Sequence, residues 1–172
     1  TTYIYTLSLH DALPISLAWL FWLLSGLRRA AYASGLLRTA SLPAPVIVAG
    51  NISVGGTGKT PFVIWLAATL GERGHKIGVV SRGYGGAANR EPVLVTPDSD
   101  PAVAGDEAVL LARRTGLPMA VCSDRVAAAR LLCSRYPIEV LLSDDGLQHH
   151  RLPRQLEIVL LDGERGLGNG WL

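Results

Sequence analysis

The sequence predicts an α/β fold, in which a parallel β-sheet is covered by helices on both faces. From residue 46 onward, short apolar runs alternate with helix-like segments, and polar clusters follow the apolar runs. In parallel sheets, ligands bind beside the carboxyl ends of the strands, which is where these clusters are expected. A further apolar stretch near the N-terminus predicts a helix that precedes the sheet.

The expected elements follow from local composition. Continuous apolar runs are typical of strands that are buried on both faces. We expect strands at 46–49, 76–80, 92–96, 118–122, 138–142 and 156–161, and helices at 61–73, 107–115 and 125–136. Pro61 lies in the opening turn of the first helix and Gly74 follows its end, which are favoured positions for these residues.

Composition limits the possible functions. The chain has 172 residues, enough for one domain with a buried core, and a formal net charge of +2. This weak charge gives no reason to expect a nucleic-acid partner. The two cysteines, Cys122 and Cys133, lack the spacing of metal ligands. We therefore expect free thiols that pack as small apolar side chains.

Both ends of the chain differ from its middle. Residues 1–16 fit neither a signal peptide nor the pattern that follows, and we interpret them as a leader of non-native origin, such as a vector or adapter remnant. Residues 41–172 form the expected α/β domain. Because the sequence stops in a glycine-rich stretch just after a strand, we expect that the C-terminal part of the domain is missing.

An apolar run at 17–27 begins a helical arm that we place at 17–40. The run is too short to span a bilayer, which takes about 20 residues. Its aromatic and basic neighbours are Trp19, Trp22, Arg28, Arg29 and Tyr32. Such side chains favour the boundary between lipid and water. We expect residues 17–32 to bind a membrane surface, with burial in a protein core as the alternative.

The segment 46–61 joins an apolar strand to a glycine-rich turn and a helix. Backbone N–H groups of such a turn cradle phosphate oxygens, so we expect a P-loop and a P-loop NTPase-like fold, with a simple glycine-rich turn between strand and helix as the alternative. Lys59 would reach the terminal phosphates and the Thr60 hydroxyl would bind Mg²⁺. The residues expected to bind a nucleoside triphosphate are Ser53, Val54, Gly55, Gly56, Thr57, Gly58, Lys59 and Thr60. Ser53 stands where glycine is usual.

Pairs of carboxylates stand at the end of one expected strand and at the start of one expected helix. Asp144 and Asp145 follow the run 138–142, a position where P-loop proteins commonly hold magnesium. Adjacent carboxylates repel each other, which also favours a nearby cation, although a solvated turn is the alternative. Asp106 and Glu107 open an expected helix. There they either complement the helix dipole or accept the proton of an attacking hydroxyl.

Two loops could contact a phosphate acceptor. Arg82 could bind phosphate with two hydrogen bonds and Tyr84 could line a groove, but a packed glycine turn explains both equally well. Gln148 and His149 follow the carboxylate pair, so we expect them near the substrate. Adjacent histidines rarely bind one ion, so the pair formed by His149 and His150 does not predict a metal site.

Five segments, taken in order, resemble the tetraacyldisaccharide 4'-kinase family of lipid A synthesis. They are 50–61, 79–86, 105–107, 143–152 and 162–170. Each segment alone is a weak or moderate signal, whereas the ordered set is highly specific. The resemblance covers the chain from about residue 17 to its end.

The resemblance implies a kinase that transfers the γ-phosphoryl group of ATP, with Mg²⁺, to the 4'-hydroxyl of a tetraacylated glucosamine disaccharide lipid. It implies a place at the cytoplasmic face of the inner membrane of Gram-negative bacteria. Asp106 becomes the favoured base, paired in the family with a histidine of the C-terminal half. The implied sets are Asp106, Lys59 and Asp145 for catalysis, Thr60, Asp144 and Asp145 for metal, and Arg82, Tyr84, Glu107, Gln148 and His149 for the substrate.

Two other functions fit parts of the sequence. A P-loop ATPase of the partitioning or metal-chaperone type would share the turn, but such proteins carry a lysine where this chain has Val54. A catalytically incompetent fragment that binds nucleotide without turnover is the second alternative. We expect little kinase activity from these 172 residues alone.

Overall fold

The computed structural model describes residues 9–51, 58–86 and 91–161, and the chain divides into two units, 1–39 and 40–172. The first unit contains α1 (Leu9–Ala33). Large apolar side chains of α1 are more than half exposed, namely Trp19, Leu20, Trp22, Leu23, Leu24 and Leu27. Within the residues that the structure describes, we find no helix that combines the length and apolar character needed to cross a membrane.

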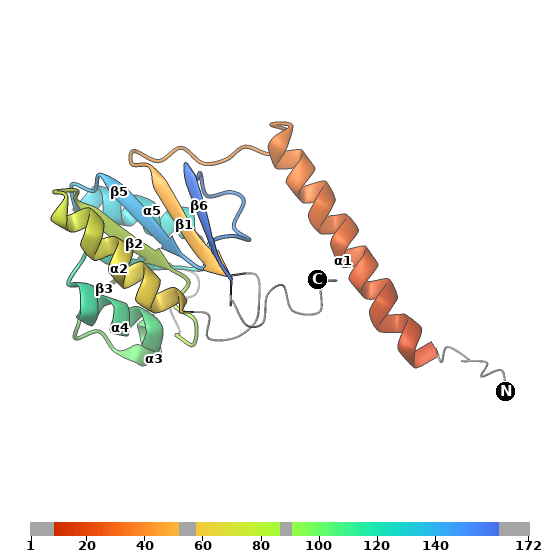
Figure 1. Cartoon of the computed structure of the whole chain (residues 1–172), viewed down its shortest axis with the longest axis horizontal. Helices are drawn as coiled ribbons and strands as arrows, with labels where there is room; N and C mark the ends of the chain where they lie inside the picture. Colours follow the sequence, from red (N-terminus) through yellow and green to blue (C-terminus); the bar gives the residue numbers. More distant parts are fainter. Residues whose placement is uncertain (1–8, 52–57, 87–90, 162–172) are drawn as a thin grey trace. The chain divides into compact units, whose positions relative to one another are not determined.

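The second unit is built on one six-stranded sheet with the order β3-β4-β2-β5-β1-β6 (Figure 1). Its strands are β1 (Val46–Asn51), β2 (Ile77–Ser81), β3 (Val93–Val95), β4 (Met119–Val121), β5 (Val140–Asp144) and β6 (Leu156–Leu160). Five strands are parallel, and the edge strand β3 is antiparallel to β4. The predicted parallel sheet is thus confirmed except at this edge strand. The stretch 82–92 is too short for the helical crossover that a parallel strand would need, so β3 runs in the opposite direction.

Helices cover both faces of the sheet, as predicted. The helices of this unit are α2 (Lys59–Glu72), α3 (Pro101–Ala104), α4 (Asp106–Thr115) and α5 (Arg125–Arg135). Successive strand residues point to opposite faces. Val79 accordingly packs into the core beneath α2 and α4, while Val80 packs into the core beneath α5. The inner strands β1, β2, β4 and β5 are therefore largely buried on both sides, whereas the edge strand β6 is largely exposed.

In the second unit, the predicted boundaries agree with the observed ones to within two residues, whereas the arm predicted at 17–40 differs from α1, which spans Leu9–Ala33. Helix α2 begins at Lys59 instead of Pro61, and β5 extends to Asp144, so this carboxylate belongs to the strand itself. The short helix α3 was not predicted. Asp100 caps it by accepting a hydrogen bond from the Ala102 backbone N–H. Cys122 is buried and Cys133 is half-buried, and no disulfide joins them.

Gly105 joins α3 to α4 and has a φ of 89°, which disfavours any residue with a side chain. A Cβ atom at this position would lie 2.5 Å from the backbone oxygen of Tyr84 and 3.0 Å from the carbonyl carbon of Gly83. The turn that presents Asp106 and Glu107 therefore depends on a glycine at this point.

We predict that Gly105→Ala lowers the free energy of unfolding by at least about 2 kcal/mol, because backbone strain and a backbone clash act together. Gly116→Ala is the matched control, since Gly116 has a φ of 63° but open space around its Cβ position. The control should cost about 1 kcal/mol. Urea denaturation of both variants measures the difference, and equal losses would contradict the role of the clash.

Candidate active site

Polar side chains gather where β1, β4 and β5 end and α2, α4 and α5 begin. Gly58 precedes α2 with a φ of 74°, and Lys59 and Thr60 are the first two residues of the helix. The N-terminus of a helix carries free N–H groups and a partial positive charge, so it attracts phosphate. The predicted loop residues Ser53, Val54, Gly55, Gly56 and Thr57 lie outside the described residues.

Lys59 forms an ion pair with Asp145, in which Nζ lies 3.0 Å from Oδ1. Asp145 has a φ of 55°, in the left-handed region, where aspartate is one of the better-tolerated residues. Its backbone N–H donates to the carbonyl oxygen of Ala49 at 2.9 Å. The structure thus brings together a predicted phosphate-binding lysine and a predicted metal-binding carboxylate.

Thr60 and Glu107 are joined by a hydrogen bond although they lie 47 positions apart in the sequence. The Thr60 hydroxyl donates to Glu107 Oε1 at 2.5 Å. The sequence assigned Glu107 to the substrate, whereas the structure places it against the residue predicted to bind Mg²⁺. Asp106, the predicted base, is the exposed first residue of α4 and precedes Glu107 on the same turn.

Asp144 is the most buried carboxylate of the site, with 1% of its surface exposed. The pKa of Asp144 is raised to about 6, mainly by burial and also by the nearby carboxylates Glu107 and Asp145, while Lys59 and Arg125 oppose the shift. Its Oδ1 atom has no hydrogen-bond partner among the described residues. A buried oxygen without a protein partner is available to a cation or to another donor.

Arg125 is a buried cation of this site that the sequence did not single out. Its Nη1 donates to the carbonyl of Cys122 at 3.0 Å, and its Nη2 donates to the carbonyl of Asp145 at 3.4 Å. Burial lowers the pKa of Arg125, and the charge of Arg82 adds to this effect. Arg125 is the first residue of α5, four positions after the end of β4, and its sequence position alone does not mark it as a buried cation.

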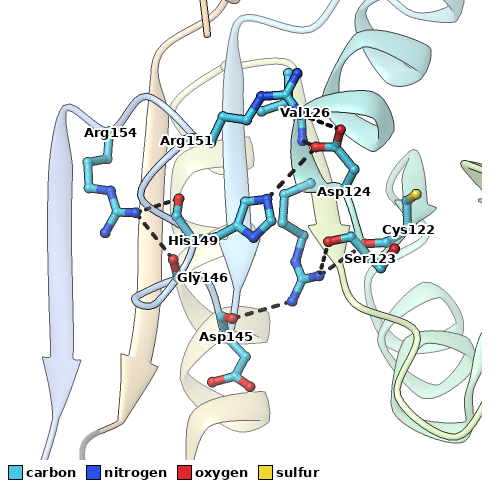
Figure 2. Close-up of polar contacts among 10 residues, drawn as sticks. Cys122, Ser123, Asp124, Val126, Asp145, Gly146, His149, Arg151 and Arg154 are labelled. Carbon is cyan, nitrogen blue, oxygen red and sulfur yellow. Dashed lines mark hydrogen bonds and ion pairs between the residues drawn. The ribbon is translucent and has the colours of Figure 1, made fainter. Parts of the chain in front are cut away.

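The two predicted substrate loops differ in their contacts. Tyr84 is 81% exposed, and Arg82 and Gln148 are also exposed. His149 is half-buried, with Nε2 3.8 Å from Asp124 Oδ1 (Figure 2). Burial lowers the pKa of His149, the charge of Arg125 acts in the same direction, and Asp124 opposes it. Their role toward a substrate stays a prediction.

The oxygen atoms of this site fit Mg²⁺. This ion prefers oxygen ligands and is usually held by one or two carboxylates together with water and phosphate oxygens. Thr60, Asp144 and Asp145 are the predicted ligands, and Asp144 supplies the unpartnered oxygen. Within the described parts of the chain, no group of three or more histidine, cysteine, aspartate or glutamate residues is arranged to hold a metal.

Comparison with known proteins identifies the family. The family described as tetraacyldisaccharide-1-P 4'-kinase (LpxK) matches residues 11–172. The match starts at residue 11, whereas the resemblance seen in the sequence was expected to start at about residue 17. The origin of residues 1–16 stays a prediction.

Two relatives illustrate the similarity. The tetraacyldisaccharide 4'-kinase of Actinobacillus succinogenes is 53% identical over 160 residues, which cover 93% of this chain and 49% of that protein. The crystal structure of the "apo" form of LpxK from Aquifex aeolicus in complex with ATP matches with a TM-score of 0.79 and 33% identity, over 87% of this chain and 48% of that one. The chain thus spans about half the length of these relatives. It belongs to the tetraacyldisaccharide-1-P 4'-kinase family.

Proposed function

We propose that this chain supplies the nucleotide-binding half of a kinase that transfers the γ-phosphoryl group of ATP to the 4'-hydroxyl of a tetraacylated glucosamine disaccharide lipid. The observation that carries the proposal is the paired contact at the start of α2. Lys59 meets Asp145 and Thr60 meets Glu107. A cation, a hydroxyl and carboxylates at a helix N-terminus are the parts that phosphoryl transfer requires.

Nucleotide binding follows from charge and geometry. The Lys59 ammonium and the N-terminus of α2 would neutralise the terminal phosphates of ATP. Thr60, Asp144 and Asp145 would hold the magnesium ion, which neutralises phosphate charge when bound. The predicted loop 53–57 would surround the phosphates with backbone N–H groups.

Asp106 is the proposed general base. It begins α4 beside Glu107, and Glu107 accepts a hydrogen bond from Thr60, one of the predicted metal ligands. It is exposed, as a residue that must meet an incoming hydroxyl needs to be. Its task would be to orient the sugar hydroxyl and accept its proton.

The properties of α1 support the proposal of a lipid as phosphoryl acceptor and of a membrane surface as the location of the protein. Its exposed tryptophans and leucines precede Arg28 and Arg29, a combination that favours an anionic lipid surface. The rings of Trp19 and Trp22 contact each other edge-on, with centroids 6.1 Å apart. We place the arm at the cytoplasmic face of the inner membrane of a Gram-negative bacterium, where a lipid acceptor would be within reach.

The first test follows the phosphate. Radiolabelled ATP is incubated with tetraacyldisaccharide 1-phosphate and either this chain or a chimaera, in which the corresponding C-terminal part of the Actinobacillus succinogenes kinase follows residue 172. The chimaera should label the lipid, and the chain alone should label little. Release of free phosphate without labelled lipid would favour the ATPase alternative.

We predict that Asp106→Ala in the chimaera lowers kcat by about 10²–10⁴-fold while the KM for ATP changes little, because a general base acts in the transition state. Asp98→Ala is the matched control, since Asp98 is an exposed carboxylate outside the site. Steady-state kinetics of both variants decide the role. Unchanged turnover in Asp106→Ala would remove this residue from catalysis.

We predict that Asp144→Asn stabilises the ligand-free protein at pH 7.5 but weakens magnesium-dependent ATP binding at least about tenfold. The pKa of Asp144 in the folded state is raised to about 6. Between pH 4 and pH 6 the folded state therefore binds more protons than the unfolded state, and wild-type stability falls as the pH rises. The gain in the free energy of unfolding should approach about 3 kcal/mol above pH 6.

This gain should shrink as the pH falls from 6 to 4 and vanish below the ordinary pKa of aspartate. Urea denaturation across this range measures it, and calorimetry with ATP and Mg²⁺ measures binding. A stability difference that does not vary with pH would show that Asp144 is not the titrating group.

We predict that replacing Trp19 and Trp22 together by serine lowers binding to vesicles that contain phosphatidylglycerol by on the order of tenfold, because both rings lose their place at the lipid surface. Trp65→Ser is the control, since Trp65 is a comparably exposed tryptophan of the second unit. Vesicle sedimentation gives the bound fractions. Equal effects of the two changes would contradict a membrane role for α1.

A further inference from the structure

One guanidinium group, that of Arg154, contacts several backbone carbonyls of the loop between β5 and β6. Its Nη2 donates to the carbonyl of His149 at 2.7 Å and to that of Gly146 at 3.5 Å (Figure 2). Its Nη1 donates to the carbonyl of Leu147 at 3.0 Å and also pairs with Glu157. Several carbonyls of one short segment thus converge on one side chain.

The loop also has contacts with other elements and within itself. His149 and Arg151 both pair with Asp124, and the backbone N–H of Ala40 donates to the carbonyl of Arg151. The backbone N–H of His149 donates to the carbonyl of Gly146, and that of Leu152 donates to the carbonyl of His149. Leu152 is fully buried, and it fixes the far end of the segment. The carbonyls of Gly146 and His149 accept these turn hydrogen bonds and also accept from Arg154. The turns and the guanidinium therefore support each other.

Asp145, at the start of the loop, is held by different groups. Its N–H donates to Ala49 and its carbonyl accepts from Arg125. Arg125 therefore holds the residue that pairs with Lys59, whereas Arg154 holds the part that carries Gln148 and His149. Arg125 thus contacts the start of the loop near the predicted nucleotide site, and Arg154 contacts the segment that follows it.

We propose that Arg154 is a positioning residue that fixes Gln148 and His149 toward the phosphate acceptor, independently of the nucleotide. This inference rests on the proposed kinase function. The planar guanidinium suits the task, because it directs several N–H groups at fixed angles, whereas a lysine offers one compact charge. The side chain is 16% exposed, so water replaces these bonds poorly.

The first experiment needs no catalysis. Hydrogen exchange of this chain is followed by mass spectrometry for wild type, Arg154→Lys and the control Glu157→Gln, which removes the ion pair but leaves the carbonyl bonds. Arg154→Lys should speed exchange in a peptide that covers residues 146–152 by on the order of tenfold relative to wild type. Peptides from β1 and α5 should be unchanged, as should all peptides of the control.

The second experiment separates positioning from stability. In the chimaera, Arg154→Lys should raise the KM for the lipid acceptor by on the order of tenfold while the KM for ATP stays within about twofold. Glu157→Gln should leave both values close to wild type. A general loss of structure would instead reduce activity toward both substrates.

Three outcomes would overturn the proposal: unchanged exchange in 146–152, faster exchange throughout the chain, or equal changes in the two KM values. A wild-type chimaera that phosphorylates no lipid would overturn the kinase assignment and with it the acceptor role. Exchange in 146–152 would then still decide whether Arg154 holds the loop, so the two failures are distinguishable.

Discussion

The parallel pairing of β1 with β5, in which Ala49 lies opposite Asp144, determines where the polar groups of this molecule meet. Neighbouring strands are about 4.8 Å apart, so residues that follow them emerge side by side. The chain after β1 leads to Lys59, and the chain after β5 begins with Asp145. Their ion pair follows from this register. A shift by one residue would turn Asp144 to the opposite face of the sheet.

The charges of the site are only partly balanced. Three carboxylates, Asp144, Asp145 and Glu107, lie near Lys59 and Arg125, and burial makes ionisation of Asp144 unfavourable. In a protein selected for stability alone, an uncharged residue would serve better at this position. Retaining a buried acid is typical of a site that a cation or phosphate completes, because strain at functional sites is tolerated when ligand binding relieves it.

Much of the fold could be predicted because it depends on local patterns. Continuous apolar runs predicted the strands. The carboxyl ends of these runs predicted the edge of the sheet near which Lys59, Thr60, Asp144 and Asp145 lie. The contact between Thr60 and Glu107 could not be predicted, because it depends on how α2 and α4 pack. Adjacent helix residues such as Asp106 and Glu107 point in different directions, and only packing decides which one faces α2.

Arg125 was missed for a different reason. Arginine is seldom buried, and its neighbours in the sequence do not mark it as an exception. Its partners are backbone carbonyls, among them that of Asp145, 20 residues further along the chain. A carbonyl group is present at every residue, so the sequence alone carries no signal of which ones converge. The direction of β3 was missed for a related reason, since it follows from loop length and not from composition.

The hydrogen bond between Thr60 and Glu107 makes the start of α2 and the start of α4 thermodynamically linked. A threonine hydroxyl has one proton to donate, and here Glu107 accepts it. A ligand that accepts a hydrogen bond from the Thr60 hydroxyl must therefore compete with Glu107. When the ligand displaces Glu107, the first turn of α4 loses this contact with α2. By reciprocity, anything that draws that turn away from α2 alters the affinity of the phosphate end of the site by the same factor. Ligand binding at the start of α2 would in this way affect the start of α4.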